Sequence, residues 1–289
     1  MTDVTTPDGR TLRVHEVGDP AGVPVVVHHG TPSTGVLYTP WLTDGVRLIG
    51  FDRAGYGGST RNPGRRIAAV AADVRAIADA LELERFATWG ISGGGPHALA
   101  CAALLPDRVL AAAAVSSPAP FDADGLDWFE GQGESNVVEH NAAAQGETTV
   151  RPLLEEMHAG MTASGVEELR DGLASLLTGP DREVLTGELA AFLHGTIAGT
   201  GGVDGWLDDD LAFVSPWGFD LGSIAVPVLI RHGMQDAFVP FRHSRWLADR
   251  IPGSEAQITP GDGHLTIYEH GILDVQDWLL QDRSDNRRS

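Results

Sequence analysis

The sequence predicts an α/β protein with a mostly parallel, doubly wound sheet and an inserted helical region. Short β-branched apolar runs alternate with helical patterns, the alternation stops near residue 119, and it resumes near residue 216. Strands that alternate with helices imply right-handed crossovers and helices on both faces of the sheet. Hydrophobic residues make up 42% of the 289 positions, which allows a sizeable core.

The first part of the chain opens with a turn signal and then alternates strand and helix patterns. Residues 6–9, Thr-Pro-Asp-Gly, join two short alternating stretches. Apolar residues from Ile67 to Leu81 recur at spacings of three and four, which indicates an amphipathic helix with one buried stripe. The expected elements are a hairpin over 4–17, strands over 24–29, 46–51, 86–91 and 108–115, a short helix towards residue 41, and longer helices over 67–81 and 98–105.

The stretch from residue 119 to residue 215 has a composition of its own. It contains 19 Asp and Glu residues against three Arg residues, and helical pieces replace the strand-like runs. We therefore expect a helical, acidic cap over 119–215, inserted into a core formed by 1–118 and 216–289. The run 208–210, three aspartates, is interpreted as a solvated loop because no EF-hand spacing surrounds it. The core resumes with expected strands over 226–231 and 256–259 and helices over 242–250 and 270–280.

A glycine-rich stretch holds the first candidate for catalysis. Residues 90–94, Gly-Ile-Ser-Gly-Gly, match the G-x-S-x-G turn, and they stand between a strand pattern and a helix pattern. The turn is so tight that bulky side chains beside Ser92 would collide with their neighbours, and it exposes the Ser92 hydroxyl. A serine hydroxyl is a weak nucleophile at neutral pH. It therefore needs a histidine base, a carboxylate that orients the histidine, and donors for the oxyanion.

The base and the carboxylate are found after two late strands. Asp236 follows the expected strand 226–231, and His264 follows the expected strand 256–259. Loops after parallel strands gather at the carboxyl ends of the strands, where ligands bind. Asp262 is interpreted as a loop cap because it lies in the same loop as the histidine, and Asp122 is the less favoured alternative for the acid. The order Ser92, Asp236, His264 is the one that a strand-turn-helix nucleophile requires.

These motifs together resemble the α/β-hydrolase superfamily of serine hydrolases, in its capped esterase or proline iminopeptidase-like branch. Residues 29–32, His-Gly-Thr-Pro, look like the family's H-G-x-P oxyanion loop. Residues 52–57, Asp-Arg-Ala-Gly-Tyr-Gly, look like its D-x-x-G-x-G loop. The resemblance covers nearly the whole chain. It implies the α/β-hydrolase fold with a cap inserted after the strand that follows the nucleophile helix.

The resemblance also implies a role for each candidate residue. Ser92 attacks a carbonyl carbon, His264 takes the serine proton and returns it to the leaving group, and Asp236 orients the imidazole. The backbone N–H groups of Thr31 and Gly93 form the oxyanion hole. No metal and no cofactor take part in this chemistry.

The substrate pocket is expected under the cap, beside the catalytic loops. Its predicted lining consists of Tyr38, Trp41, Phe238 and Leu265. Five cap aromatics are either further walls or the cap's own small core: Trp128, Phe129, Phe192, Trp206 and Phe213. The negative charge of the cap disfavours anionic substrates and favours a small uncharged or cationic molecule, although a solvated acidic face explains the charge equally well.

Composition excludes several other classes of partner and site. The formal charge of −20 argues against nucleic acid or an anionic membrane as partner. Cys101 is the only cysteine, so no internal disulfide forms, and the histidines show no metal-ligand spacing. No basic segment followed by an apolar one opens the chain, and no apolar run approaches the ~18 residues of a membrane span. A cytoplasmic location is expected by default.

The main functional prediction is a cofactor-independent serine hydrolase that cleaves a carboxylic ester through an acyl-enzyme. An aminopeptidase similar to the proline iminopeptidases, whose caps hold a substrate amine with acidic residues, is the alternative. This chain departs from that family because residues 29–32 lack the H-G-G-P glycine pair and the elbow lacks the G-G-S-W-G form. Lactone or C–C bond hydrolysis uses the same parts. A non-catalytic receptor on the same fold is least favoured, because Ser92, Asp236 and His264 are all present.

Overall fold

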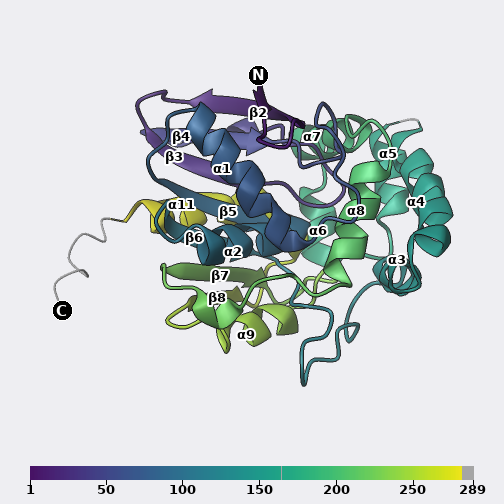
Figure 1. Cartoon of the computed structure of the whole chain (residues 1–289). Helices are drawn as coiled ribbons and strands as arrows, with labels where there is room; N and C mark the ends of the chain where they lie inside the picture. The colour runs from purple at the N-terminus through teal and green to yellow at the C-terminus, as the bar shows by residue number, and fades with distance from the viewer. Residues whose placement is uncertain (164, 282–289) are drawn as a thin grey trace.

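The computed structural model describes residues 1–163 and 165–281, which contain a sheet of eight strands with helices around it (Figure 1). The strand order is β1-β2-β4-β3-β5-β6-β7-β8. β2 pairs in antiparallel fashion with β1 and β4, and the other neighbouring strands are parallel. The predicted fold class is therefore confirmed. The strands are β1 Thr2–Thr5, β2 Thr11–Gly18, β3 Val23–His28, β4 Val46–Phe51, β5 Phe86–Ile91, β6 Val109–Val115, β7 Val228–Gly233 and β8 Glu255–Thr259.

The central strand β5 is buried along its whole length and sends alternate side chains to two apolar layers. On one face Phe86 packs with residues of α1 (Val70–Ala80), α2 (Gly95–Leu104) and α9 (Arg242–Ala248). On the other face Trp89 packs with residues of α11 (Ile272–Leu280). Because β5, β7 and β8 run parallel, the loops that follow them meet at one edge of the sheet, and these loops carry the predicted catalytic residues.

Some element bounds differ from the expected ones for local reasons. The short helix expected towards residue 41 is a single 3₁₀ turn, Thr39–Trp41. β7 starts two residues late, after Pro227, which has no N–H group to donate to a neighbouring strand. The other helical turns are 3₁₀ at Ile67–Ala69, Ser92–Gly94 and Leu221–Ser223, α10 at His264–Thr266 and a π turn at Ile267–Gly271.

Between β6 and β7 the described chain is helical. Figure 1 shows these helices gathered beyond one end of the sheet. Many of them share an apolar core in which Leu154, Leu169 and Trp206 are buried. The inserted helices are α3 Glu134–Ala144, α4 Glu147–Thr162, α5 Val166–Gly172, α6 Gly179–Val184, α7 Gly187–Ala198 and α8 Asp204–Phe213. The division into a core and a cap of 119–215 stays a prediction, and residues 282–289 of that core lie outside the described residues.

The helices of the fold are short. α4, with 16 residues, is longer than any other helix in the ranges 1–163 and 165–281. Within those ranges no helix combines the length and the apolar character needed to cross a lipid bilayer.

Candidate active site

Ser92 directly follows β5 and begins the turn that leads into α2. Its backbone φ is +54°, in the left-handed region that costs a residue with a side chain roughly 1–2 kcal/mol. Such strain is typical of functional positions, where the surrounding structure enforces it. Ser92 is half-buried and its side chain lines a cavity. The geometry is that of a nucleophile elbow.

Two glycines of the elbow are required by close backbone contacts. A Cβ atom at Gly90 would lie 2.1 Å from the carbonyl oxygen of Gly94. A Cβ atom at Gly94 would lie 2.1 Å from the carbonyl oxygen of His28 on β3. Any larger residue would push the strand and the helix apart, so the spacing of this motif has a steric cause.

The predicted base and acid are hydrogen-bonded to each other. Nδ1 of His264 lies 2.7 Å from Oδ2 of Asp236. Oδ1 of Asp236 accepts the N–H groups of Phe238 and Val239, each at 2.8 Å, and Nε2 of His232 lies 3.1 Å from Oδ2. The carboxylate is therefore fixed by partners on both oxygens.

The electrostatics of the pair suit a general base. Burial alone would raise the pKa of Asp236, but the charge of His264 and the hydrogen bonds from His232 and His264 outweigh it and lower the pKa well below 3.8. Burial alone would lower the pKa of His264, but the charge and hydrogen bond of Asp236 outweigh it and raise the pKa above 6.5. Since Nδ1 is bonded to the carboxylate, Nε2 is the nitrogen left to take a proton.

The predicted oxyanion loop, residues 29–32, is held by Arg53. Its guanidinium donates to the carbonyl oxygen of His29, to that of Gly30 at 3.2 Å and to the hydroxyl of Thr31 at 3.0 Å. Thr31 in turn donates its hydroxyl to Asp209 at 2.7 Å. Thr31 and Gly93 line the same cavity as Ser92, which makes their N–H groups candidates for oxyanion donors.

The cavity beside Ser92 has a volume of about 90 Å³ and lies between the sheet edge and the inserted helices. On the sheet side Phe238 borders it and stacks on His264, with ring centroids 4.6 Å apart. The inserted region supplies most of the remaining wall, through its helices and the turn after α5: Glu139, His140, Met157, Met161, Leu173, Leu176, Trp206, Asp210 and Phe213.

A family model described as the α/β hydrolase fold matches residues 23–271, from β3 to the turn before α11. The chain belongs to the α/β-hydrolase family. It is 30% identical to a non-heme chloroperoxidase from Streptomyces lividans, over 97% of this chain and 96% of the relative.

Solved structures share the fold. A thermophilic esterase from Thermogutta terrifontis superposes with a TM-score of 0.70 at 23% identity, over 96% of this chain and 97% of that chain. An α/β hydrolase fold protein from Nakamurella multipartita is 28% identical, with a TM-score of 0.64, over 96% of this chain and 98% of that chain.

One residue of the hydrolase site has no signal in the sequence. The carboxylate of Asp181 on α6 accepts the N–H groups of His264 at 3.0 Å, Leu265 at 2.8 Å and Thr266 at 3.2 Å. A Cβ atom at Gly263 would lie 2.4 Å from this carboxylate, so the approach depends on a glycine. Asp181 therefore positions the turn that carries His264. No local pattern could reveal it, since 83 residues separate Asp181 from His264.

Three of the predicted pocket residues do not line the hydrolase cavity. Tyr38 and Trp41 are buried with Trp89 and Tyr268 on the opposite face of the sheet from α1, where the indole N–H of Trp41 donates to the carbonyl oxygen of Tyr268 at 2.9 Å. Leu265 packs with Leu177, Leu185 and Ala190 under the inserted helices. Phe238 is the one of the four that borders the cavity.

The cap aromatics divide between the two roles that the sequence leaves open. Trp128, Trp206 and Phe213 border the cavity. Phe192 packs against Tyr38, with ring centroids 4.8 Å apart. Phe129 packs against Trp128 and Phe121.

The alternative acids of the hydrolase lie elsewhere. Asp262 accepts the hydroxyl of Thr259 and lies 3.8 Å from Arg231, which agrees with a role within its loop. Asp122 is exposed. Asp236 is the acid that contacts His264.

The interpretation of residues 208–210 as a solvated loop is wrong. The three aspartates lie on α8 and are 2%, 0% and 1% exposed. Asp208 pairs with Arg61 at 2.8 Å, and Asp209 pairs with Arg53 and Arg65. The run looks solvated because its basic partners stand far away in the sequence.

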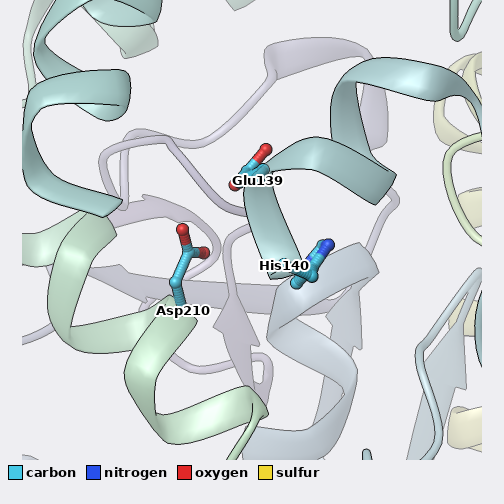
Figure 2. A group of neighbouring side chains, drawn as sticks. All are labelled: Glu139, His140 and Asp210. Carbon is cyan, nitrogen blue, oxygen red and sulfur yellow. The ribbon is translucent and has the colours of Figure 1, made fainter. Parts of the chain in front are cut away.

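The third aspartate belongs to a cluster on the cavity wall. The possible ligand atoms of Glu139, His140 and Asp210 lie within 4.8 Å of one another (Figure 2). These residues come from α3 and α8, so no short motif links them. One imidazole and two carboxylates are ligand types that bind a metal ion or another cation.

Proposed function

We propose that this α/β-hydrolase cleaves a small carboxylic ester through a covalent acyl-enzyme, without a cofactor. The observation that carries the proposal is the strained Ser92 elbow opening into a cavity, at the sheet edge where His264 is bonded to Asp236. A cavity of about 90 Å³ favours a short acyl group or a small alcohol. A cytoplasmic location is part of the same proposal.

In the proposed reaction the Ser92 oxygen attacks the ester carbonyl carbon while Nε2 of His264 takes the hydroxyl proton. The bond to the alcohol oxygen then breaks, and His264 gives its proton to that oxygen. Water attacks the acyl-enzyme with His264 again as base, which releases the acid and restores the Ser92 hydroxyl. Asp236, ionised because of its low pKa, stabilises the imidazolium formed in each step.

The oxyanion of each tetrahedral intermediate would be stabilised by backbone donors. The N–H groups of Thr31 and Gly93 are the proposed donors, because both residues line the cavity with Ser92. One donor of this kind contributes about 2.7–4 kcal/mol of barrier lowering. Arg53 supports them by holding the carbonyl groups of the loop.

Several reactions use the same parts and stay as alternatives. Lactone and C–C bond hydrolysis need the same nucleophile, base and oxyanion donors. The S. lividans relative is named a chloroperoxidase. Transfer of the acyl group from the acyl-enzyme to hydrogen peroxide in place of water, giving a peracid, is therefore an alternative for this chain. Cleavage of aminoacyl amides is a further alternative, and a non-catalytic receptor is the least supported.

Hydrolysis of p-nitrophenyl acetate, butyrate and octanoate by the wild type and by Ser92→Ala tests the proposal. We expect the two short esters to react faster than the octanoate, and the variant to lose at least about a thousandfold in kcat. The variant should keep the wild-type circular dichroism spectrum. Equal rates for the two proteins would overturn the proposal and direct attention to amides, lactones and hydrogen peroxide as co-substrate.

A further inference from the structure

The wall of the cavity beside Ser92 carries two buried carboxylates, and none of the described residues that border the cavity is an arginine or a lysine. Glu139 and Asp210 are 6% and 1% exposed, and both border the cavity. Figure 2 shows them on the neighbouring helices α3 and α8. Among the described residues, no N–H or hydroxyl group donates a hydrogen bond to Asp210, and its side-chain partner is the Glu139 carboxyl group, with which it forms a hydrogen bond only while one of the two carries a proton. Glu139 accepts the indole N–H of Trp206 at 2.7 Å.

An unpaired buried carboxylate is costly, so such a pair holds either a proton or a cation. Burial and the neighbouring Glu139 carboxylate raise the pKa of Asp210 well above 3.8. A proton on Asp210, hydrogen-bonded to Glu139, therefore persists to higher pH than on an ordinary aspartate. The amide oxygen of Gln132, on the same wall, also lacks a donor within the described part of the chain. This wall is rich in free acceptors, and a ligand that brings N–H donors would satisfy them.

We propose that Glu139 and Asp210 form a subsite for a protonated amino group, so that the preferred substrates are small esters carrying a primary or secondary ammonium group. The reference to esters rests on the proposed function, whereas the cation subsite rests on the two carboxylates alone. Each ammonium N–H donates to an acceptor at about 2.7–3.2 Å.

The rest of the cavity suits an organic cation. Met157, Trp206 and Phe213 border it and offer apolar and aromatic surface to the carbon atoms beside the nitrogen. Because Ser92 and both carboxylates border one cavity of about 90 Å³, a substrate that reaches all three must be small. A β-amino ester is such a substrate, and we choose it as the probe.

A divalent metal ion is the competing occupant, and it would use His140 as its third ligand. Nδ1 of His140 lies 2.8 Å from the carbonyl oxygen of Asn136. An ammonium group binds without an imidazole ligand. Its N–H groups would donate hydrogen bonds to Asp210 and Gln132, for which the described residues supply no N–H or hydroxyl donor. Titration with metal ions alone separates the two occupants.

The binding test uses calorimetry, which does not depend on turnover. Propylammonium is titrated into the wild type, Asp210→Asn and Glu139→Gln, with 1-propanol as the neutral probe. We expect saturable binding of propylammonium to the wild type and a loss of about thirtyfold or more in affinity in either variant. Glu156→Gln is the matched control, since it removes the same charge from an exposed position on α4 and should change the affinity by less than about twofold.

The outcomes of the titrations are distinct. Binding of 1-propanol as tight as that of propylammonium overturns the subsite, and so does an equal loss of affinity in Glu156→Gln. Zn²⁺ or Mn²⁺ binding that needs Asp210, without propylammonium binding, overturns the ammonium group as occupant in favour of a metal ion. Two variants are used so that a folding defect in one leaves the other as a test.

A kinetic test links the subsite to the proposed function. β-Alanine methyl ester and methyl butanoate differ only by an ammonium group in place of a methyl group. We expect kcat/KM to favour the β-alanine ester by at least about tenfold in the wild type, with the preference lost in Asp210→Asn. Cleavage of methyl butanoate without this preference overturns the subsite and keeps the ester hydrolase. Propylammonium binding that needs Asp210, without cleavage of any ester, keeps the subsite and overturns the ester hydrolase.

Discussion

Asp209 and Asp210 are neighbours on α8 and equally buried, yet their surroundings are opposite. Asp209 accepts hydrogen bonds from Arg53, from Arg65 at 2.6 Å and from the hydroxyl of Tyr56 at 2.8 Å. Burial alone would raise the pKa of Asp209, but the two arginines outweigh it and lower the pKa well below 3.8. Burial and Glu139 raise the pKa of Asp210. Partners, and not burial, decide which of the two carries a charge.

The difference separates a structural carboxylate from a functional one. Asp209 joins the inserted helices to Arg53, the residue that holds the oxyanion loop, so its charge stabilises both the fold and the site. Asp210 faces the cavity without a donor among the described residues, so its charge costs stability in the empty protein. Buried groups that lower the stability of the protein without its ligand are typical of binding sites, where the ligand supplies the missing partner.

Removal of the structural charge should give the largest effect. Asp209→Asn leaves Arg53 and Arg65 buried without a counter-charge, which costs about 3–5 kcal/mol in comparable buried pairs. Urea unfolding at neutral pH measures the loss of unfolding free energy. A loss below about 1 kcal/mol would mean that water solvates the two arginines or that another acid pairs with them. The contrast between Asp209 and Asp210 as structural and functional carboxylates would then fail.

Removal of the functional charge should have the opposite sign. Asp210→Asn ends the repulsion with Glu139 and adds an N–H donor towards it, for a gain of about 1–2 kcal/mol at a pH above the folded pKa of Asp210, where the wild-type carboxylate is ionised. In the wild type the folded pKa of Asp210 is raised, so the stability that its proton confers is full below pH 3.8 and is lost as the pH rises through the folded pKa. The difference in unfolding free energy between Asp210→Asn and the wild type should therefore be small near about pH 4 and grow with pH.

Urea unfolding at several pH values measures this growth. The titratable groups that face Asp210 are Glu139 and His140 on α3 and Asp209 on α8. Glu156→Gln is the control for the loss of one negative charge, because it removes an exposed carboxylate from the same region without changing the cavity wall. A variant less stable than the wild type at every pH would show that Asp210 has a structural partner.

The sequence predicted the parts of the site that depend on local chemistry. The strand, the tight turn and the helix around Ser92 follow from glycine spacing, and close contacts at Gly90 and Gly94 give that spacing its cause. The Asp236–His264 hydrogen bond follows from the position of both loops at the carboxyl ends of parallel strands. Strand patterns and loop order therefore gave the fold and the expected catalytic residues.

The parts that depend on distant partners could not be predicted in this way. Arg53 stands 156 residues before Asp209, and without that pairing an acidic run looks solvated. Tyr38 and Trp41 precede a predicted strand closely, but nearness in sequence did not decide which face of the sheet they cover. The cavity wall comes from inserted helices whose packing no single helical pattern specifies.

Asp181 is a third buried carboxylate, intermediate between the other two, because backbone N–H groups satisfy it in place of arginines. Its charge adds to the larger effect of Asp236 in raising the pKa of His264. In the proposed reaction His264 acts as a base in its neutral form, so kcat/KM should rise with pH through this pKa. In Asp181→Asn the rising limb should therefore move to lower pH, with a stability loss of about 1 kcal/mol because the amide oxygen still accepts an N–H group.

The pH profile of p-nitrophenyl acetate hydrolysis tests this role, with Asp181→Ala beside Asp181→Asn. Both variants remove the charge, so both should shift the limb, but only the alanine removes the acceptor for the N–H groups of His264, Leu265 and Thr266. The alanine variant should lose more stability, about 2 kcal/mol, and more of its kcat. A fall in kcat with the limb unmoved in both variants would mean that Asp181 holds the turn without tuning His264. In that case the contrast in charge would be limited to Asp209 and Asp210, and Asp181 would act only as a hydrogen-bond acceptor.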